Sequence, residues 1–135
     1  MLCSDPLGME SGAIPDENLK CSSSYKKEED ETHSRLNTGG VWVAKTEKVG
    51  GDEWLGITFG DVPAIITAVA TQGRRGHPAS WVTKYKLQYL DESEKLVYYS
   101  EKETDTDKVL NNTQDRKSTR LNSSHEIPSR MPSSA

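Results

Sequence analysis

The apolar residues in the middle of the chain follow a period of two, and no window shows a sustained helical period with capping residues. Apolar side chains at every second position predict strands that bury one face, whereas a run that is apolar on both faces predicts a central strand. This pattern predicts an all-β sandwich or barrel with at most one or two short helical turns. The expected strands are residues 41–44, 55–59, 65–71 (the central strand), 81–89 (with Trp81, Tyr85 and Tyr89 on one face) and 96–99, with a turn at 91–94.

The composition changes after residue 114. Every Trp, Tyr and Phe lies before that point, whereas residues 115–135 are rich in Ser and contain few large apolar side chains. Such a stretch cannot bury enough surface to offset its ordering entropy. The folded part is therefore expected to end at residue 114, and residues 115–135 are predicted to be unpaired coil.

The same tail matches DNA of technical origin. Residues 115–125 correspond to one reading frame of a common sequencing-library adapter, and the same frame resumes at residues 129–135. We therefore interpret residues 115–135 as a cloning or assembly artefact. A natural, Ser-rich disordered tail is the alternative.

Charge and hydropathy exclude several classes of protein. The chain has 17 Lys and Arg against 21 Asp and Glu, a net charge of -4, which argues against a nucleic-acid partner. No apolar run has the length needed to cross a bilayer. The first residues lack the basic and apolar segments of a signal peptide, which fits a fragment whose Met1 is not the natural start. Two cysteines are too few for a dense disulfide scaffold or a four-Cys zinc site.

The residues that could form a metal or catalytic site are few and badly spaced. Cys3, Cys21, His33 and His77 match no metal-ligand spacing, so neither a metal nor another cofactor is expected. Cys21 and His33 could act as nucleophile and base, but no Asn or Asp motif accompanies them to orient the histidine. No catalytic residue and no enzymatic activity are therefore expected.

Seven blocks of the sequence occur in the order found in one known family. They are residues 3–16, 21–25, 34–37, 42, 53–55, 69–74 and 81–89. On these blocks the chain resembles the discoidin domain, also called the coagulation factor V/VIII type C domain. The resemblance implies a jelly-roll-like β-sandwich of the galactose-binding-domain type, with its C-terminal strands missing. Residues 3–114 would then be a partial discoidin domain.

The resemblance also has implications for the cysteines and for modification. In the family a final cysteine bonds the first one; Cys3 matches the first, and its partner is missing from this sequence. Cys21 stands where the family has a small residue, so a buried thiol is expected there. Family domains are extracellular, in secreted proteins or ectodomains, and Asn111 opens a glycosylation acceptor triplet.

The end loops of such a sandwich are where the resemblance places recognition. In membrane-binding members the first loop carries exposed apolar side chains, but here it carries Glu28, Glu29 and Asp30, which anionic lipid would repel. The expected function is a non-catalytic extracellular recognition or cell-adhesion module that binds a cell-surface or matrix protein or glycan. The alternatives are a phospholipid membrane-surface module, for which lipid is the less expected partner, and a carbohydrate-binding appendage of a larger enzyme.

Four residues are the candidates for ligand binding, in loops expected at residues 26–33, 45–52 and 72–80. Tyr25 matches a tyrosine that lines the ligand pocket in neuropilin-like members. Arg74, Arg75 and His77 precede Trp81, and arginine close to an aromatic ring is typical of protein or glycan recognition.

The missing closing strands generate the first prediction. The 135-residue chain is expected to express poorly or to aggregate, because open apolar strand edges pair with other chains. Size-exclusion chromatography followed by thermal unfolding tests this. A soluble monomer with a cooperative melt would contradict it.

Overall fold

The chain forms two compact units, the first built mainly from Pro6–Thr58 and the second from Phe59–Met131. We call them the N-terminal and the C-terminal unit. Among the described residues, no helix is both long and apolar enough to cross a membrane. The computed structural model describes residues 5–45, 52–60, 64–74, 80–100, 108–111, 116–120 and 127–128, the last two ranges and residue 111 by their backbone alone.

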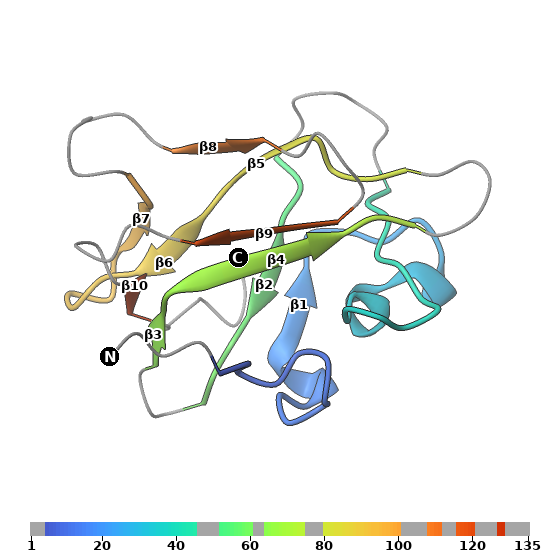
Figure 1. Cartoon of the computed structure of the whole chain (residues 1–135), viewed down its shortest axis with the longest axis horizontal. Coiled ribbons are helices and arrows are strands. Elements are labelled where there is room, and N and C mark those ends of the chain that lie inside the picture. Colours follow the sequence, from blue (N-terminus) through green and yellow to red (C-terminus); the bar gives the residue numbers. More distant parts are fainter. Residues whose placement is uncertain are drawn as a thin grey trace. The chain divides into compact units, whose positions relative to one another are not determined.

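One antiparallel strand pair organises the N-terminal unit (Figure 1). It joins β1 (Leu19–Cys21) to β2 (Leu55–Ile57), with Leu19 opposite Ile57. The side chain of Leu19 is only 1% exposed. The alternation predicted for residues 55–59 therefore forms a strand over its first three residues.

Asn18 and Thr58 extend this pairing by one residue. The Thr58 amide donates to the Asn18 carbonyl at 2.9 Å, and the Asn18 side-chain amide donates to the Thr58 carbonyl at 2.9 Å. The Thr58 hydroxyl also lies within bonding distance of the Asn18 carbonyl, at 3.2 Å. A polar residue pair thus closes the end of the ladder, where the backbone groups would otherwise have only water as a partner.

Short turns of 3₁₀ helix connect these elements. At most one or two helical turns were expected from the sequence, but the described residues contain three. They escape a periodicity argument because each spans one turn only and is held by local bonds to the backbone rather than by an apolar face. They are η1 (Asp16–Asn18), η2 (Lys27–Glu29) and η3 (Glu31–His33).

The guanidinium of Arg35 fixes the chain that precedes β1. It donates to the carbonyls of Met9 and Ile14, each at 2.7 Å, and to the carboxylate of Asp16 at 2.7 Å. The Arg35 side chain is only 12% exposed, so its bonds to the two carbonyls are partly shielded from water, whereas Asp16 is 63% exposed. At Gly8, where φ is +120°, a side chain would be strained and its Cβ would clash with Ala13 at 2.6 Å.

The prediction of a strand at residues 41–44 is wrong. The backbone there makes single hydrogen bonds to turn residues instead of a strand ladder: the Val43 amide donates to the Glu29 carbonyl at 3.0 Å, and the Tyr25 amide donates to the Val43 carbonyl at 2.8 Å. The Trp42 indole N–H donates to the Ser23 carbonyl at 2.9 Å. The Val43 amide and carbonyl are thus hydrogen-bonded in an extended, apolar segment that has no neighbouring strand.

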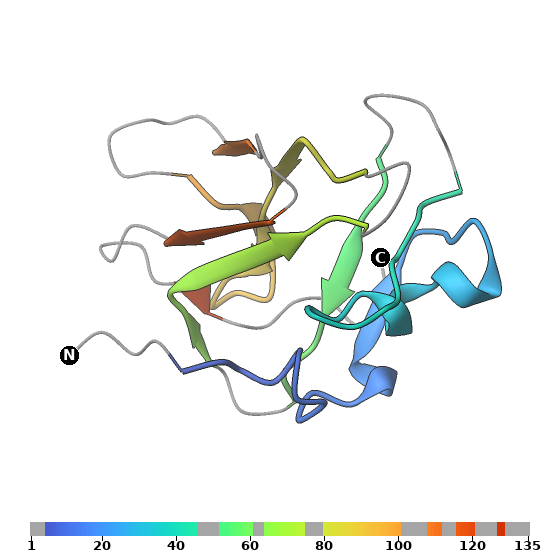
Figure 2. The ribbon, with the colours of Figure 1, turned by 45° about the vertical axis from the view of Figure 1, so that its right-hand side comes forward.

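Four antiparallel pairs make up the C-terminal unit (Figures 1 and 2). They are β3–β10, β4–β9, β5–β8 and β6–β7. Among the described residues each strand has one strand neighbour. The strands are β3 (Ile65–Ile66), β4 (Ala68–Gln72), β5 (Lys84–Lys86), β6 (Gln88–Leu90), β7 (Leu96–Tyr98), β8 (Val109–Asn111), β9 (Arg116–Arg120) and β10 (Ile127–Pro128).

Tyr99 is the centre of the core in this unit. It is 2% exposed and packs against Ile66, Leu87 and Tyr89. Its backbone is bonded on both sides, because its amide donates to the Leu87 carbonyl at 2.9 Å and its carbonyl accepts from the Lys108 amide at 2.9 Å. The Tyr99 ring, which directly follows β7, therefore contacts β3 through Ile66 and β6 through Tyr89, while its backbone is bonded to residues just before β6 and β8.

The hairpin predicted at the end of this segment is confirmed. β6 pairs with β7, and the turn between them is closed by Asp91, whose carboxylate accepts from the amides of Ser93 and Lys95 at 2.8 and 2.9 Å. Glu94 adopts a φ of +61° inside the turn. An Asp that bonds the backbone two residues on is a recognised turn former, which is why the sequence predicted it.

Two longer strands of the prediction are interrupted. Residues 65–71 form two short strands, β3 and β4, instead of one central strand, and Ile65 is 58% exposed. Residues 81–89 give β5 and β6, with residues 81–83 outside any strand and Trp81 39% exposed. Tyr85 and Tyr89 are half-buried as expected. The predicted apolar face is therefore confirmed within β5 and β6, but not at Trp81.

The prediction that the chain is unpaired coil from Asp115 onwards is wrong at two places. β9 pairs with β4 over five residues, and β10 pairs with β3 over two. Backbone groups form ladders whatever side chains they carry, so a segment with little apolar surface can still occupy a strand edge. Composition reflects only how much apolar surface a segment can bury, not whether its main chain can pair.

The bonds of Arg35 generate a prediction about stability. Replacing Arg35 by Ala should lower the free energy of unfolding by about 2–4 kcal/mol, because two backbone carbonyls lose charge-assisted donors in a shielded position. Thermal or urea unfolding measures the change. Asp16→Asn is the matched control: Asp16 is 63% exposed, and such surface ion pairs contribute about 0–1 kcal/mol. Equal effects of the two substitutions would contradict the role given to Arg35.

Candidate functional site

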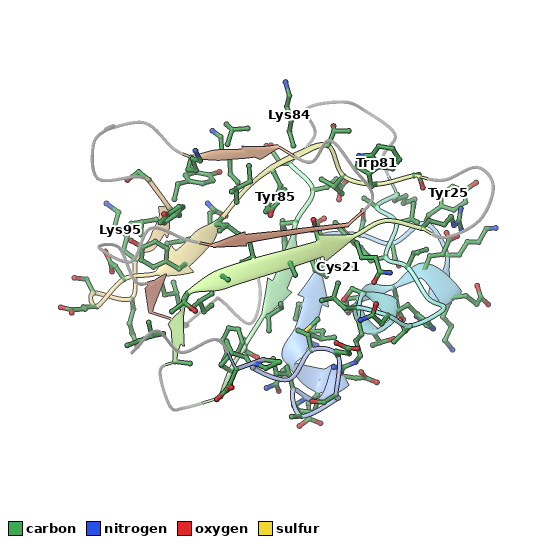
Figure 3. All side chains as sticks on the ribbon, in the orientation of Figure 1. Cys21, Tyr25, Trp81, Lys84, Tyr85 and Lys95 are labelled. Atoms are coloured by element: carbon green, nitrogen blue, oxygen red, sulfur yellow. The ribbon has the colours of Figure 1, made fainter. Side chains whose placement is uncertain are left out.

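Tyr25 is the candidate ligand residue that the structure describes in the N-terminal unit (Figure 3). Its side chain is 55% exposed, and the Lys26 ammonium lies 5.5 Å from the ring centroid. The backbone at Tyr25 is held by the bond to Val43 described above. Tyr25 thus offers an aromatic face and a cation to solvent from a fixed backbone position.

The residues after Tyr25 form an acidic turn, which we define as residues 26–33. Within it the Asp30 carboxylate accepts from the Thr32 amide at 2.9 Å and from the Thr32 hydroxyl at 2.6 Å, and it lies 2.9 Å from Nδ1 of His33. The bonds from Thr32, with the smaller contribution of His33, hold the pKa of Asp30 below its usual value. Asp30 therefore caps the N-terminal end of η3, and its carboxylate stays ionised.

Cys21 is a second polar feature of the same unit. It is half-buried, not fully buried as expected, and its thiol donates to the Glu31 carboxylate at 3.2 Å. Burial raises the pKa of the thiol, and the hydrogen bond and negative charge of Glu31 raise it further. Nδ1 of His33, meanwhile, faces Asp30. A thiol held in its neutral form is a poor nucleophile, so this arrangement favours a structural cysteine.

A cluster around Glu53 was missed in the sequence analysis. The Glu53 carboxylate accepts from the hydroxyls of Ser22 and Ser23, the latter at 2.8 Å. The Ser22 hydroxyl accepts from the Trp54 amide at 2.9 Å, and the Ser23 hydroxyl accepts from the Lys45 amide at 3.0 Å. These bonds anchor the chain beside Tyr25. The partners Ser23 and Glu53 are 30 residues apart in the sequence, so no local sequence pattern predicts their contact.

Arg74 is the candidate residue described in the C-terminal unit. It is exposed, and its amide donates to the Ser80 carbonyl at 2.7 Å in an isolated antiparallel bridge. A Cβ at Gly73 would lie 2.4 Å from the Ser80 carbonyl oxygen and 2.6 Å from Cβ of Trp81, so only glycine fits. The bridge between Arg74 and Ser80 and the close approach of Gly73 to Ser80 thus hold the two ends of the intervening segment together, an arrangement that we call the pinch at Gly73. The exposed side chains of Trp81 and Val82 follow directly.

The remaining candidates fall largely outside the described residues. Arg75, His77 and Cys3 lie outside them, and Asn111 is described only as a backbone position in β8, opposite Lys84. The described part of the chain holds no cluster of three His, Cys, Asp or Glu side chains that could bind a metal. Tyr25 and Arg74 each sit in a different unit, and each is described within its own surroundings.

Comparison with known proteins identifies the family. The model of the F5/8 type C domain matches residues 18–128.

The chain belongs to the F5/8 type C, or discoidin, family.

This confirms the resemblance and the β-sandwich fold class. The match extends beyond residue 114 and covers β9 and β10.

Three relatives illustrate the similarity. Coagulation factor V of Sus scrofa is 35% identical over 117 residues, which is 80% of this chain and 5% of the relative. Retinoschisin of Mus musculus is 32% identical over 123 residues, 84% of this chain and 53% of the relative. Lactadherin of Rattus norvegicus is 31% identical over 131 residues, 89% of this chain and 29% of the relative. The chain therefore spans about half of retinoschisin and less of the other two.

The family membership settles two broader points. The relatives are secreted or extracellular proteins, so this discoidin domain is extracellular, as the sequence analysis expected. Discoidin domains are binding domains, and this chain is one of them.

The contact between Cys21 and Glu31 generates a prediction about reactivity. In a Cys3→Ser background, Glu31→Gln should speed alkylation of Cys21 several-fold at mildly alkaline pH, because the substitution removes a charge that keeps the thiol protonated. Iodoacetamide labelling followed by mass spectrometry measures the rate. Glu28→Gln, an exposed change in the same acidic turn, is the matched control and should leave the rate unaltered.

The same contact fixes the sign of one pH effect. The pKa of Cys21 is raised above the ordinary value of 9.0 in the folded state, so the neutral thiol contributes stability below pH 9.0. That contribution is lost as the pH rises through the folded-state pKa, and Glu31→Gln should shrink it. An identical alkaline decline in stability for both proteins would argue against the contact.

Proposed function

We propose that this discoidin domain is a non-catalytic extracellular recognition or cell-adhesion module that binds a cell-surface or matrix protein or glycan through its loops. The observation that carries the proposal is the presentation of Tyr25, a 55% exposed aromatic ring beside the Lys26 ammonium on an anchored backbone. Exposed aromatic rings on rigid supports are typical anchors of protein and glycan binding. Bonds from Ser22 and Ser23 to Glu53 supply that support.

Arg74, Arg75 and His77 are the proposed ligand-binding residues of the C-terminal unit. The pinch at Gly73 supports this assignment, since it fixes the position from which exposed Arg74 extends. Guanidinium groups bind carboxylates and sulfates with two parallel hydrogen bonds, so the ligand class that fits is an acidic protein segment or an anionic glycan. No metal or cofactor is part of the proposal.

Binding to a phospholipid surface is the second candidate, and one observation favours it. Trp81 and Val82 form an exposed apolar pair, 39% and 52% accessible. Against it stands the acidic turn, in which Glu28 is exposed and carboxylates outnumber lysines. An anionic membrane would repel the carboxylates of that turn.

The domain boundary and the origin of the tail belong to the same proposal. We place the natural recognition module in residues 3–114 and ascribe residues 115–135 to an adapter-derived artefact, a view supported by the two in-frame adapter matches. Pairing of β9 and β10 does not bear on where their sequence came from. Sequencing the uninterrupted transcript would decide the matter, and would also reveal whether the parent carries an enzyme domain to which this one is a carbohydrate-binding appendage.

Charge reversal tests the proposed surface. Arg74→Glu with Arg75→Glu should weaken binding of the labelled chain to cultured cells by about tenfold or more, as expected for the loss of central arginine contacts. Flow cytometry gives the affinity. The melting temperature should barely change, because Arg74 is exposed. Lys84→Glu with Lys95→Glu is the matched control, an equal charge change at two exposed positions labelled in Figure 3.

The nature of the partner follows from three treatments of the same assay. Loss of binding after protease treatment of the cells would identify a protein, and loss after glycosidase treatment would identify a glycan. Binding to phosphatidylserine vesicles that resists the arginine substitutions would overturn the proposal in favour of the lipid candidate.

A further inference from the structure

One side of the C-terminal unit carries exposed side chains from three strands. In β5, Lys84 and Lys86 are exposed, whereas Tyr85 between them is half-buried. Figure 3 shows Lys84 and Tyr85 on opposite sides of β5. The Lys86 ammonium lies 5.2 Å from the ring centroid of Tyr98 in β7, so the exposed sides of β5 and β7 belong to one surface. We call this surface the outer face, and its residues are Lys84, Lys86, Leu96, Tyr98 and Val109.

The strand register places three apolar side chains on the outer face. Val109 lies opposite Lys86 across the β5–β8 pair, and Leu96 lies two residues before Tyr98 in β7. Opposed residues in an antiparallel pair, and residues two apart in one strand, project from the same side of a sheet. Leu96, Tyr98 and Val109 are 40%, 45% and 39% exposed. Strand residues that face solvent are normally polar, so apolar residues gathered in this way indicate a contact surface.

Opposite charges stand at the two ends of the outer face. Lys84 and Lys86 lie at the end formed by β5. The turn between β6 and β7 lies at the other end and carries three carboxylates against one ammonium, those of Asp91, Glu92, Glu94 and Lys95. Glu92 and Glu94 are exposed. The outer face therefore runs from a positive end through an apolar middle to a negative end.

Such a surface is complementary to itself when one copy is turned end for end. In a two-fold symmetric contact each copy supplies the same patch, and two stacked sheets can keep their strands closely aligned. With the strands of the two copies antiparallel, the lysine end of one copy lies over the glutamate end of the other, and the apolar middles meet. A parallel arrangement would place lysine on lysine and glutamate on glutamate.

We propose that the outer face is the contact through which two copies of this domain associate, face to face and with their strands antiparallel. A second copy is the fitting occupant, because an identical face supplies both charges and the apolar residues in the matching order. The proposal goes beyond ligand recognition, since no residue of the outer face lies in the loops at residues 26–33, 45–52 or 72–80.

The expected dimer is weak. The outer face and its acidic turn hold few residues, whereas a standard interface has about 20–30 on each side. Association of this kind depends on concentration, so it takes place where copies are crowded together, as on a cell surface. A dimer carries the ligand-binding loops twice, and two linked binding surfaces strengthen adhesion through avidity.

Complementary charge reversal tests the contact in the full-length chain. One variant carries Lys84→Glu with Lys86→Glu, and the other carries Glu92→Lys with Glu94→Lys. Each variant alone brings like charges together at both ends of the contact and should weaken dimerisation by at least about tenfold. Mixed in equal amounts, the two variants pair opposite charges again and should restore the association. Sedimentation velocity of the soluble protein, under reducing conditions and over a range of concentrations, measures the effect.

Net charge cannot produce this pattern. The reversals change the net charge of -4 by four in each direction, to -8 and to 0. A chain with zero net charge repels its copies less than the wild type does, so overall repulsion cannot explain a loss of dimer in the glutamate-to-lysine variant. At the dilution of the cell-binding assay a weak dimer is dissociated, and Lys84→Glu with Lys95→Glu is therefore a neutral change there.

A pair of leucine substitutions tests the apolar middle without changing any charge. Leu96→Ser should weaken the dimer several-fold, because it removes apolar surface that the second copy would cover. Leu7→Ser is the matched control and should leave the dimer unaltered. Leu7 is 45% exposed, close to the 40% of Leu96, but it lies in the N-terminal unit.

Three results would overturn the proposal. A wild-type chain that stays monomeric at every concentration has no such contact. Association that resists both charge reversals uses another surface, such as an open strand edge. Failure of the mixture to restore association, with both variants melting at the wild-type temperature, rules out the antiparallel arrangement. If a charge variant does not fold, equal effects of Leu96→Ser and Leu7→Ser decide against the outer face.

Discussion

Polar side chains that bond the backbone hold the N-terminal unit together, and the guanidinium of Arg35, which bonds two carbonyls and one carboxylate, makes the most such contacts at one point. By binding the Met9 and Ile14 carbonyls it fixes the segment that leads into η1 and β1. Leu19, which opens β1, is buried in the strand pair with β2. The loops are fixed by the same kind of bond, from Asp30 to Thr32 and from the serine hydroxyls to Glu53. The described part of this small unit has few buried apolar side chains, and it gains much of its order from such polar bonds.

Local patterns in the sequence predicted the elements whose cause is local. The strand beginning at Leu55 and the β6–β7 hairpin follow from alternation and from an Asp that closes its own turn. Segments whose state depends on distant partners were predicted badly. Residues 41–44 look like a strand, but their amide and carbonyl groups bond turn residues fourteen or more positions away. The prediction of unpaired coil for residues 115–135 was wrong for a related reason, because main-chain pairing to β4 leaves no trace in side-chain composition.

The candidate site divides in the same way. Tyr25 and Arg74 are exposed, as their positions in expected loops implied. What sequence reasoning could not supply is the set of contacts that supports Tyr25, since Glu53 is about thirty positions away from the serines that bind it. Nor could it show that Cys21 is paired with Glu31, which turns a candidate nucleophile into a protonated structural group. Ionisable residues acquire their roles from neighbours that folding brings close.

The pinch at Gly73 bears on how this domain can change over evolutionary time. With Arg74 bonded to Ser80 and no room for a side chain at Gly73, the two ends of the intervening segment are held at a constant spacing by the frame itself. Insertions, deletions and replacements between those ends are therefore expected to leave the spacing, and with it the fold around Gly73, largely unaltered. The segment between Arg74 and Ser80 is accordingly a suitable place for random sequence libraries and for the grafting of foreign peptides.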